Sequence, residues 1–135
     1  MAHLRIAELR GVTSQQVETL KAHGITNAGQ LLDRASTPQG RRDLAEATGI
    51  SSADLLEMVN RADLSRIHGI GRQYSHLLED VGVDTCPELA QRNPANLHAA
   101  LREAAAGSGI KRPPTSQQVE DWVGQAKALP RAVHY

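Results

Sequence analysis

Aromatic residues and cysteine are nearly absent from this chain of 135 residues. Trp122, Tyr74 and Tyr135 are the only aromatic side chains, so a core must be built from Leu, Val, Ile and Ala. The single cysteine, Cys86, excludes an intramolecular disulfide and argues against a structural zinc site. Hydrophobic residues make up 40% of the chain, which suffices for a modest core. Abundant Ala and Leu, with no sustained apolar–polar alternation, favour helices over strands.

Net charge is also lacking, because 15 basic residues balance 15 acidic ones. This balance argues against a protein that coats nucleic acid through bulk positive charge, but it leaves room for a small local contact. No apolar run approaches the roughly 18 residues of a membrane span. The N-terminal residues lack the basic and then apolar order of a signal peptide. We therefore expect a cytoplasmic protein with no membrane partner and an unknown oligomeric state.

Helix start and stop signals divide the chain into eight to ten short helices with tight connections. Capping residues open most of them, and Gly or Pro ends them. The stretch 104–109 is expected to be a frayed helix end and a flexible loop. The expected helix boundaries are Thr37-Pro38 to about Ala47 with Gly49 as cap, a start at Ser51 or Ser52, starts at Thr85-Cys86-Pro87-Glu88 and Asn93-Pro94, and a last helix from Thr115–Gln118 to Pro130.

An imperfect internal repeat runs through the chain. Each copy reads as a hairpin, a helix, a glycine cap and a second helix. Residues 1–62 form the first, degenerate unit and residues 63–135 the second, which includes a C-terminal helix that closes the core; we expect the two to pack as one compact domain. The matching residues are Gly11-Val12-Thr13, Leu20, Gly24-Ile25-Thr26 and Leu31 in the first copy, and Gly69-Ile70-Gly71, Leu78, Gly82-Val83-Asp84 and Leu89 in the second.

The run Ile67-His68-Gly69-Ile70-Gly71 is the stretch that most directly suggests chemistry. Two glycines one residue apart tolerate positive φ and allow another backbone to approach closely. They also leave backbone N–H groups bare at the start of the next helix, where a phosphate binds readily. The alternative is a tight turn that only packs two helices together.

The pattern Leu64-x-x-Ile67-x-Gly69-Ile70-Gly71-x-x-Tyr74-x-x-Leu77-Leu78 resembles the helix-hairpin-helix motif of DNA repair and replication proteins. The chain as a whole resembles an uncharacterised bacterial family, a domain of unknown function grouped with tandem helix-hairpin-helix proteins. This resemblance implies an all-α, SAM-domain-like fold. It is carried further by residues 62–67, 83–85, 88–97, 118–123 and 125–130.

By this resemblance, the hairpin would contact a phosphate oxygen through the amides of Gly69, Gly71 and Gln73. Hairpin carbonyls, those of Ser65, Ile67 and Ile70, would hold a monovalent cation; no other cofactor or metal is expected. Such contacts position a protein on a nucleic-acid backbone without reading sequence. The predicted nucleic-acid-binding residues are Arg66, His68, Gly69, Ile70, Gly71, Arg72 and Gln73.

The first copy departs from the motif at Thr13, where the second glycine is expected. A β-branched residue resists positive φ, and its hydroxyl suits a helix N-cap that would occupy the amides a phosphate needs. We therefore interpret the first hairpin as structural, with Val17, Leu20 and Leu31 on its core face.

Several other residues have both a structural and a functional interpretation. Trp122 is expected in the core rather than stacked on a base, and Cys86 as a small, partly buried apolar residue. Lys111-Arg112 is expected to lie in a solvated loop rather than to contact a phosphate or a partner. Arg61, Arg66 and Arg72 surround the hairpin with only Asp63 opposing them, whereas Glu79, Asp80, Asp84 and Glu88 follow closely and would repel DNA on the same face.

No phosphate-binding loop, nucleophile elbow or zinc-protease motif is present, so we expect no enzyme. The hypothesis favoured by the sequence is a non-enzymatic module that binds nucleic acid weakly and without sequence preference through the second hairpin. The alternative, favoured by zero net charge, is a protein–protein interaction adaptor built on the same helical scaffold.

Overall fold

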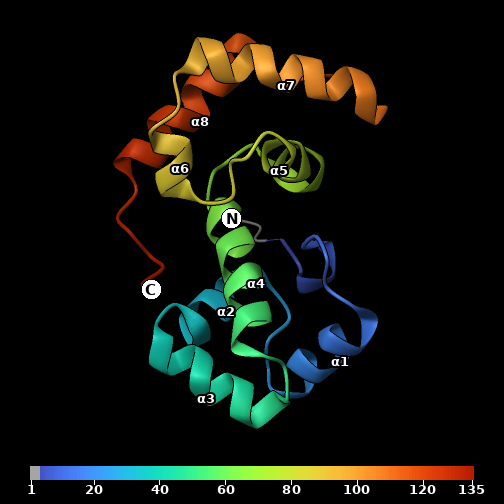
Figure 1. Ribbon diagram of the computed structural model, residues 1–135, viewed down its shortest axis with the longest axis vertical. Coiled ribbons are helices and arrows are strands. Elements are labelled where there is room, and N and C mark those ends of the chain that lie inside the picture. Colours follow the sequence, from blue (N-terminus) through green and yellow to red (C-terminus); the bar gives the residue numbers. More distant parts are fainter. Residues whose placement is uncertain (1–3) are drawn as a thin grey trace. The chain divides into compact units, whose positions relative to one another are not determined.

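The computed structural model describes residues 4–135, and all the secondary-structure elements named in this part of the chain are helices (Figure 1). The all-α prediction is confirmed, and a single isolated bridge joins Arg5 and Asn27. Residues 1–3, which belong to the N-terminal segment that lacks the residue order of a signal peptide, lie outside the described residues. The helices are a short 3-10 helix η1 (Ile6–Glu8), α1 (Ser14–Ala22), α2 (Ala28–Ala35), α3 (Pro38–Thr48), α4 (Ser52–Leu64), α5 (Gly71–Asp80), α6 (Cys86–Ala90), α7 (Pro94–Ser108) and α8 (Ser116–Ala128).

The chain divides into two compact units. Unit 1 comprises Met1–Arg66 together with Arg131–Tyr135, and unit 2 comprises Ile67–Pro130. The division falls beyond the boundary expected after residue 62, because α4 continues without a break to Leu64. The packing of both units as one compact domain stays a prediction.

Capping side chains open the helices as the sequence predicts. Thr13 and Thr115 form reciprocal capping boxes, and Thr37 and Ser51 each accept a backbone amide. Thr85 also caps α6, but not as part of a reciprocal capping box: the Glu88 carboxylate accepts a hydrogen bond from the Thr85 hydroxyl. Each such cap stabilises its helix by about 1 kcal/mol.

The prediction for residues 104–109 was wrong. Helix α7 continues through this stretch to Ser108, and Gly109 ends it in the left-handed conformation. Alanine is the best helix former, and Ala105 is buried in the core, so both propensity and packing favour a helix at the alanines of this stretch.

The two units share one internal architecture, which extends the repeat seen in the sequence. In unit 1, α4 packs against α2 and α3; in unit 2, α8 packs against α6 and α7. The same glycine cap ends the first helix of each unit: Gly24 and Gly82 have φ of 80° and 88°. In both, the following apolar residue donates its amide to a carbonyl five residues back, Ile25 to Leu20 and Val83 to Leu78.

The correspondence extends to the buried face of the last helix. Four buried residues of α4 match four of α8, each 64 positions further along the chain. Both helices follow a left-handed glycine that ends the third helix, Gly49 or Gly109. Trp122 thus lies in the core, as predicted, at the position that Met58 has in unit 1. The matched sets are Leu55, Met58, Val59 and Ala62 in α4, and Val119, Trp122, Val123 and Ala126 in α8.

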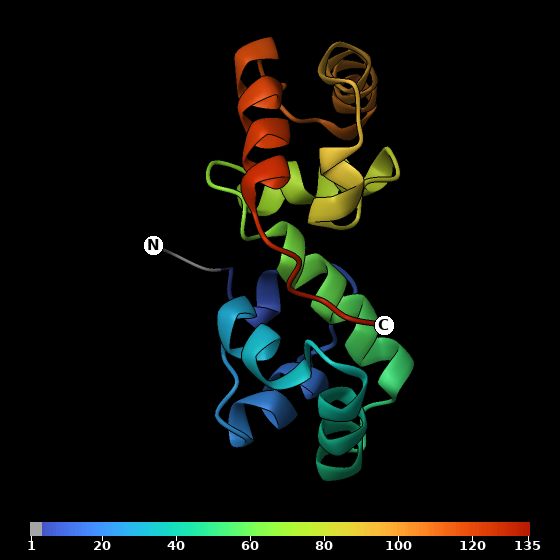
Figure 2. The same ribbon diagram turned by 90° about the vertical axis from the view of Figure 1, so that its left-hand side faces the viewer.

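The last residues of the chain return to unit 1 and cross α4 (Figure 2). Val133 joins the buried core of that unit, and the Tyr135 hydroxyl donates to the Asn60 side chain. Arg41, although buried, donates to the carbonyls of Ala35 and His134. Burial lowers the pKa of the Arg41 guanidinium. Leu97 has the equivalent place in α7, four residues after the N-cap, so this arginine is a feature of unit 1.

Candidate nucleic-acid interface

The connection between α4 and α5 is a tight glycine turn with its apolar residues turned inward. Ile67 and Ile70 are buried, whereas His68 is exposed. Gly69 and Gly71 have φ of 90° and 62°, a region in which side chains are strained. A Cβ atom on Gly69 would also lie 3.4 Å from the Trp122 indole nitrogen. Both glycines are therefore required by the turn itself.

A glutamine of α8 holds this turn in place. The backbone amide of His68 donates to Gln125 Oε1 at 2.8 Å, and Gln125 Nε2 donates to the His68 carbonyl at 3.1 Å. The same Nε2 donates to Asp121 Oδ2 at 2.8 Å, which orients the glutamine amide. The turn is thus fixed to α8 by two direct hydrogen bonds.

The start of α5 differs from every other α-helix start in residues 4–135, because no side chain caps it. The equivalent helix of unit 1 has Thr13 and Gln16 in a capping box, with bonds of 3.1 and 3.0 Å. Gly71 and Tyr74 occupy the positions 58 residues further on. Both side chains of the capping box have therefore been replaced, and the first amides of α5 are left for another acceptor.

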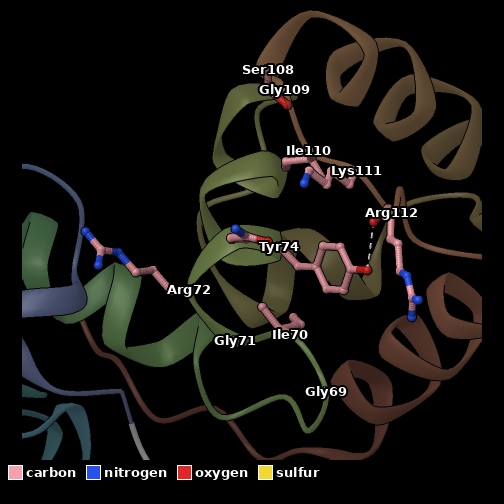
Figure 3. Close-up of a pocket in the computed structure, with 11 residues that line it drawn as sticks. Gly69, Ile70, Gly71, Arg72, Tyr74, Ser108, Gly109, Ile110, Lys111 and Arg112 are labelled. Carbon is pink, nitrogen blue, oxygen red and sulfur yellow. Dashed lines mark hydrogen bonds between the residues drawn. The ribbon is translucent and has the colours of Figure 1, made fainter.

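A hollow of about 700 Å³ lies within unit 2, between the glycine turn with the first turn of α5 and the connection from α7 to α8 (Figure 3). Among its lining residues, three are basic and none is acidic. The acidic residues that follow the turn in sequence, Glu79, Asp80, Asp84 and Glu88, are not among them. The lining consists of Gly69, Ile70, Gly71, Arg72, Gln73, Tyr74, Ser108, Gly109, Ile110, Lys111 and Arg112.

The ring of Tyr74 lines this hollow, and contacts with two other residues fix its orientation (Figure 3). Its hydroxyl donates to the Arg112 carbonyl at 2.9 Å. Its ring packs on Trp122 with centroids 5.3 Å apart and an interplanar angle of 52°. The Arg72 side chain extends away from Tyr74 and Arg112, so Arg72 contributes mainly backbone to this part of the lining.

The basic part of the lining lies in a connection that is longer in unit 2 than in unit 1. Residues 49–51 connect α3 to α4, whereas residues 109–115 connect α7 to α8. The extra length includes Lys111 and Arg112, followed by two prolines. Two of the differences between the units, an uncapped helix start and a basic connection, therefore meet at one hollow in unit 2.

The structure brings together most of the residues predicted from the sequence. Gly69, Ile70, Gly71, Arg72 and Gln73 all line the hollow, but His68 does not. Arg66 lies in unit 1, where its guanidinium is 2.9 Å from the Asp63 carboxylate. The carbonyls named for a monovalent cation belong to different units, Ser65 to unit 1 and Ile67 and Ile70 to unit 2, so that site stays a prediction.

The sequence did not indicate Tyr74 as a site residue. For Lys111 and Arg112 it favoured a solvated loop over a phosphate contact. The basic dipeptide was visible in the sequence, but nothing local indicated that its connection reaches the glycine turn. Within residues 4–135, no group of three or more His, Cys, Asp or Glu side chains is placed to hold a metal ion. Nor does any helix in the described part of the chain have the length and apolarity to cross a membrane.

Fold and site together define an all-helical protein of two similarly built units, one of which carries a basic hollow. The chain belongs to the family described as a domain of unknown function, DUF4332, which matches residues 10–129 and so covers most of both units. Comparison with curated proteins and with solved structures gave no match.

Proposed function

We propose that this protein is a non-enzymatic module that binds nucleic acid weakly and without sequence preference through the hollow of unit 2. The observation that carries the proposal is that two differences between the units meet at that hollow. In unit 1, side chains cap the helix start and a short connection follows α3. In unit 2, the cap is absent and the connection carries two cations.

The chemistry of the lining favours a phosphate group. Lys111 and Arg112 are exposed cations, and no carboxylate lines the hollow with them. Uncapped amides at the start of the ten-residue helix α5 add donors and the positive end of the helix dipole. All of these groups recognise the backbone of a nucleic acid rather than its bases, so the binding is independent of sequence.

Few cations line the hollow, so the binding is weak and sensitive to salt. If Lys111 and Arg112 neutralise two phosphates, the logarithm of the binding constant falls with the logarithm of salt concentration with a slope of about −2 on duplex DNA. The zero net charge of the chain removes any large nonspecific contribution.

The proposal includes the finer features implied by the sequence resemblance. These are a helix-hairpin-helix relationship, DNA as the natural nucleic acid, a bacterial origin and a cytoplasmic location. A monovalent cation at the carbonyls of Ser65, Ile67 and Ile70 is part of the same hypothesis. Replacing sodium with potassium at constant ionic strength tests the cation, since a bound ion of preferred size changes the affinity.

A salt titration of the full chain with labelled duplex and single-stranded oligonucleotides, followed by fluorescence anisotropy, tests the proposal. Lys111→Ala/Arg112→Ala is expected to abolish measurable binding. The matched control is Arg102→Ala/Lys127→Ala, which removes the same charge from exposed positions of α7 and α8 outside the hollow.

The proposal fails if nucleic acid does not bind at low salt, or if the control variant loses as much affinity as the Lys111/Arg112 variant. In the first case the protein–protein adaptor, which zero net charge favours, becomes the better hypothesis. In the second case binding follows overall charge, not the hollow.

A further inference from the structure

We infer that the hollow of unit 2 accepts a single unpaired nucleotide, with the base against the Tyr74 ring and the phosphate beside Lys111 and Arg112. This inference rests on the proposed function and narrows its ligand from nucleic acid in general to nucleotides that are not base-paired. It depends on the shape and the apolar part of the lining, which the contact with a phosphate does not use.

The size and composition of the hollow suit a ligand with an apolar and a charged part. Its volume of about 700 Å³ lies within the range of about 300–1,000 Å³ that is usual for small-molecule sites. Ile70, Ile110 and Tyr74 supply apolar lining, while Lys111 and Arg112 supply positive charge. A site for a backbone phosphate alone needs only cations on an open surface. The apolar residues indicate that a planar, uncharged group enters as well.

Tyr74 is prepared to stack on such a group. The Arg112 carbonyl accepts its hydroxyl hydrogen bond, and Trp122 packs on its ring, so the ring is already oriented. An aromatic side chain that is already held loses little conformational freedom on binding. Stacking of one base on an aromatic side chain contributes a factor of about five to 150 in affinity.

The same site disfavours duplex nucleic acid. A paired base is stacked on its neighbours, and its extrusion costs about as much free energy as the new stacking contributes. Unpaired bases bear no such cost. Unit 1 has Gln16 at the place of Tyr74, so only unit 2 offers an aromatic ring at this point of the repeat.

The test compares two single-stranded probes of equal length and charge on the wild-type chain. One is an oligothymidylate of about eight nucleotides, and the other carries abasic sugars at every position. We expect the abasic probe to bind at least about fivefold more weakly, and a duplex of the same length to bind more weakly than the oligothymidylate. Tyr74→Leu is expected to bind both single-stranded probes equally, whereas Tyr74→Phe is expected to retain the difference.

The wild-type comparison needs no variant, so the test does not depend on whether Tyr74→Leu folds. Equal affinity for the two single-stranded probes overturns the inference, while the proposed function stands if Lys111→Ala/Arg112→Ala still abolishes binding. If no probe binds at low salt, both proposals fail. Thymidine monophosphate is added as a competitor: displacement at lower concentration than oligothymidylate identifies a free nucleotide as the ligand, and the reverse identifies a strand.

Discussion

Replacing Gln125 with alanine tests whether the glycine turn is held in its binding geometry by α8. The substitution removes both hydrogen bonds between the glutamine amide and the His68 backbone, of 2.8 and 3.1 Å. An intramolecular hydrogen bond contributes about 0.5–1.5 kcal/mol, so the pair contributes about 1–3 kcal/mol. His68 is exposed, and solvent replaces part of the loss. We expect a cost of about 1–2 kcal/mol, confined to the turn.

Alanine also improves helix propensity, and a matched control measures that gain. Gln117 is an exposed glutamine in the same helix, so Gln117→Ala changes propensity without touching the turn. The difference between the two variants measures the contribution of the clamp together with that of the hydrogen bond from Gln125 to Asp121. Amide hydrogen exchange at His68, read by NMR, is expected to accelerate about tenfold in Gln125→Ala and not in Gln117→Ala.

The affinity for nucleic acid should also fall in Gln125→Ala and not in Gln117→Ala. A loosened turn must be re-ordered before it can meet a ligand, so Gln125→Ala is expected to weaken nucleic-acid binding several-fold with its salt slope unchanged. The reasoning is refuted if His68 exchanges at the wild-type rate in Gln125→Ala, because the clamp would then contribute nothing. It is equally refuted if exchange accelerates but affinity is unchanged, because turn geometry would then be irrelevant to the site.

Four further substitutions test the fold and the turn. Gly40→Ala is expected to destabilise unit 1 by about 1–3 kcal/mol, because its Cβ would overlap the Arg34 carbonyl oxygen. Gly124→Ala, with open space around it, should stabilise α8 by about 0.5–1 kcal/mol. Equal effects of the two variants in chemical denaturation would contradict the packing around Gly40. Arg41→Leu, which copies Leu97 of unit 2, should cost about 2 kcal/mol and speed carboxypeptidase digestion, since the His134 and Ala35 carbonyls lose their donor; unchanged digestion would show that Arg41 does not hold the C-terminal residues. Gly71→Val should weaken binding at least tenfold, measured by anisotropy, because φ of 62° strains a β-branched residue; wild-type affinity would argue against the start of α5 as the phosphate contact.

Local sequence signals predicted the helices well because their causes are local. Thr13, Ser51 and Thr115 cap the helices that they were expected to open, and Gly24, Gly49 and Gly82 adopt positive φ. A cap depends on a side chain and on amides two or three residues away, all of which are legible in a short window. The error at residues 104–109 arose where glycine and serine next to alanines were read as a break, although Ala105 packs in the core.

The candidate site was only half predictable. Gly69 and Gly71 could be predicted because a backbone position with positive φ favours glycine, which is visible in the sequence. Lys111 and Arg112 lie about forty residues further along, and only the fold of unit 2 brings them to the same hollow. Arg66 shows the opposite case, since its closeness in sequence suggested a contact, whereas the structure pairs it with Asp63.

By itself the sequence determined an all-α protein with a repeated glycine-capped helix pair, and it located the two glycines of the turn before α5. These properties follow from helix propensity, capping and backbone conformation, which act over a few residues. The tertiary structure alone decided that the repeat extends to four helices in each unit, that Tyr74 is held between Trp122 and Arg112, and that a basic connection meets the glycine turn. Such contacts join residues far apart in the chain, and their existence depends on packing rather than on any local preference.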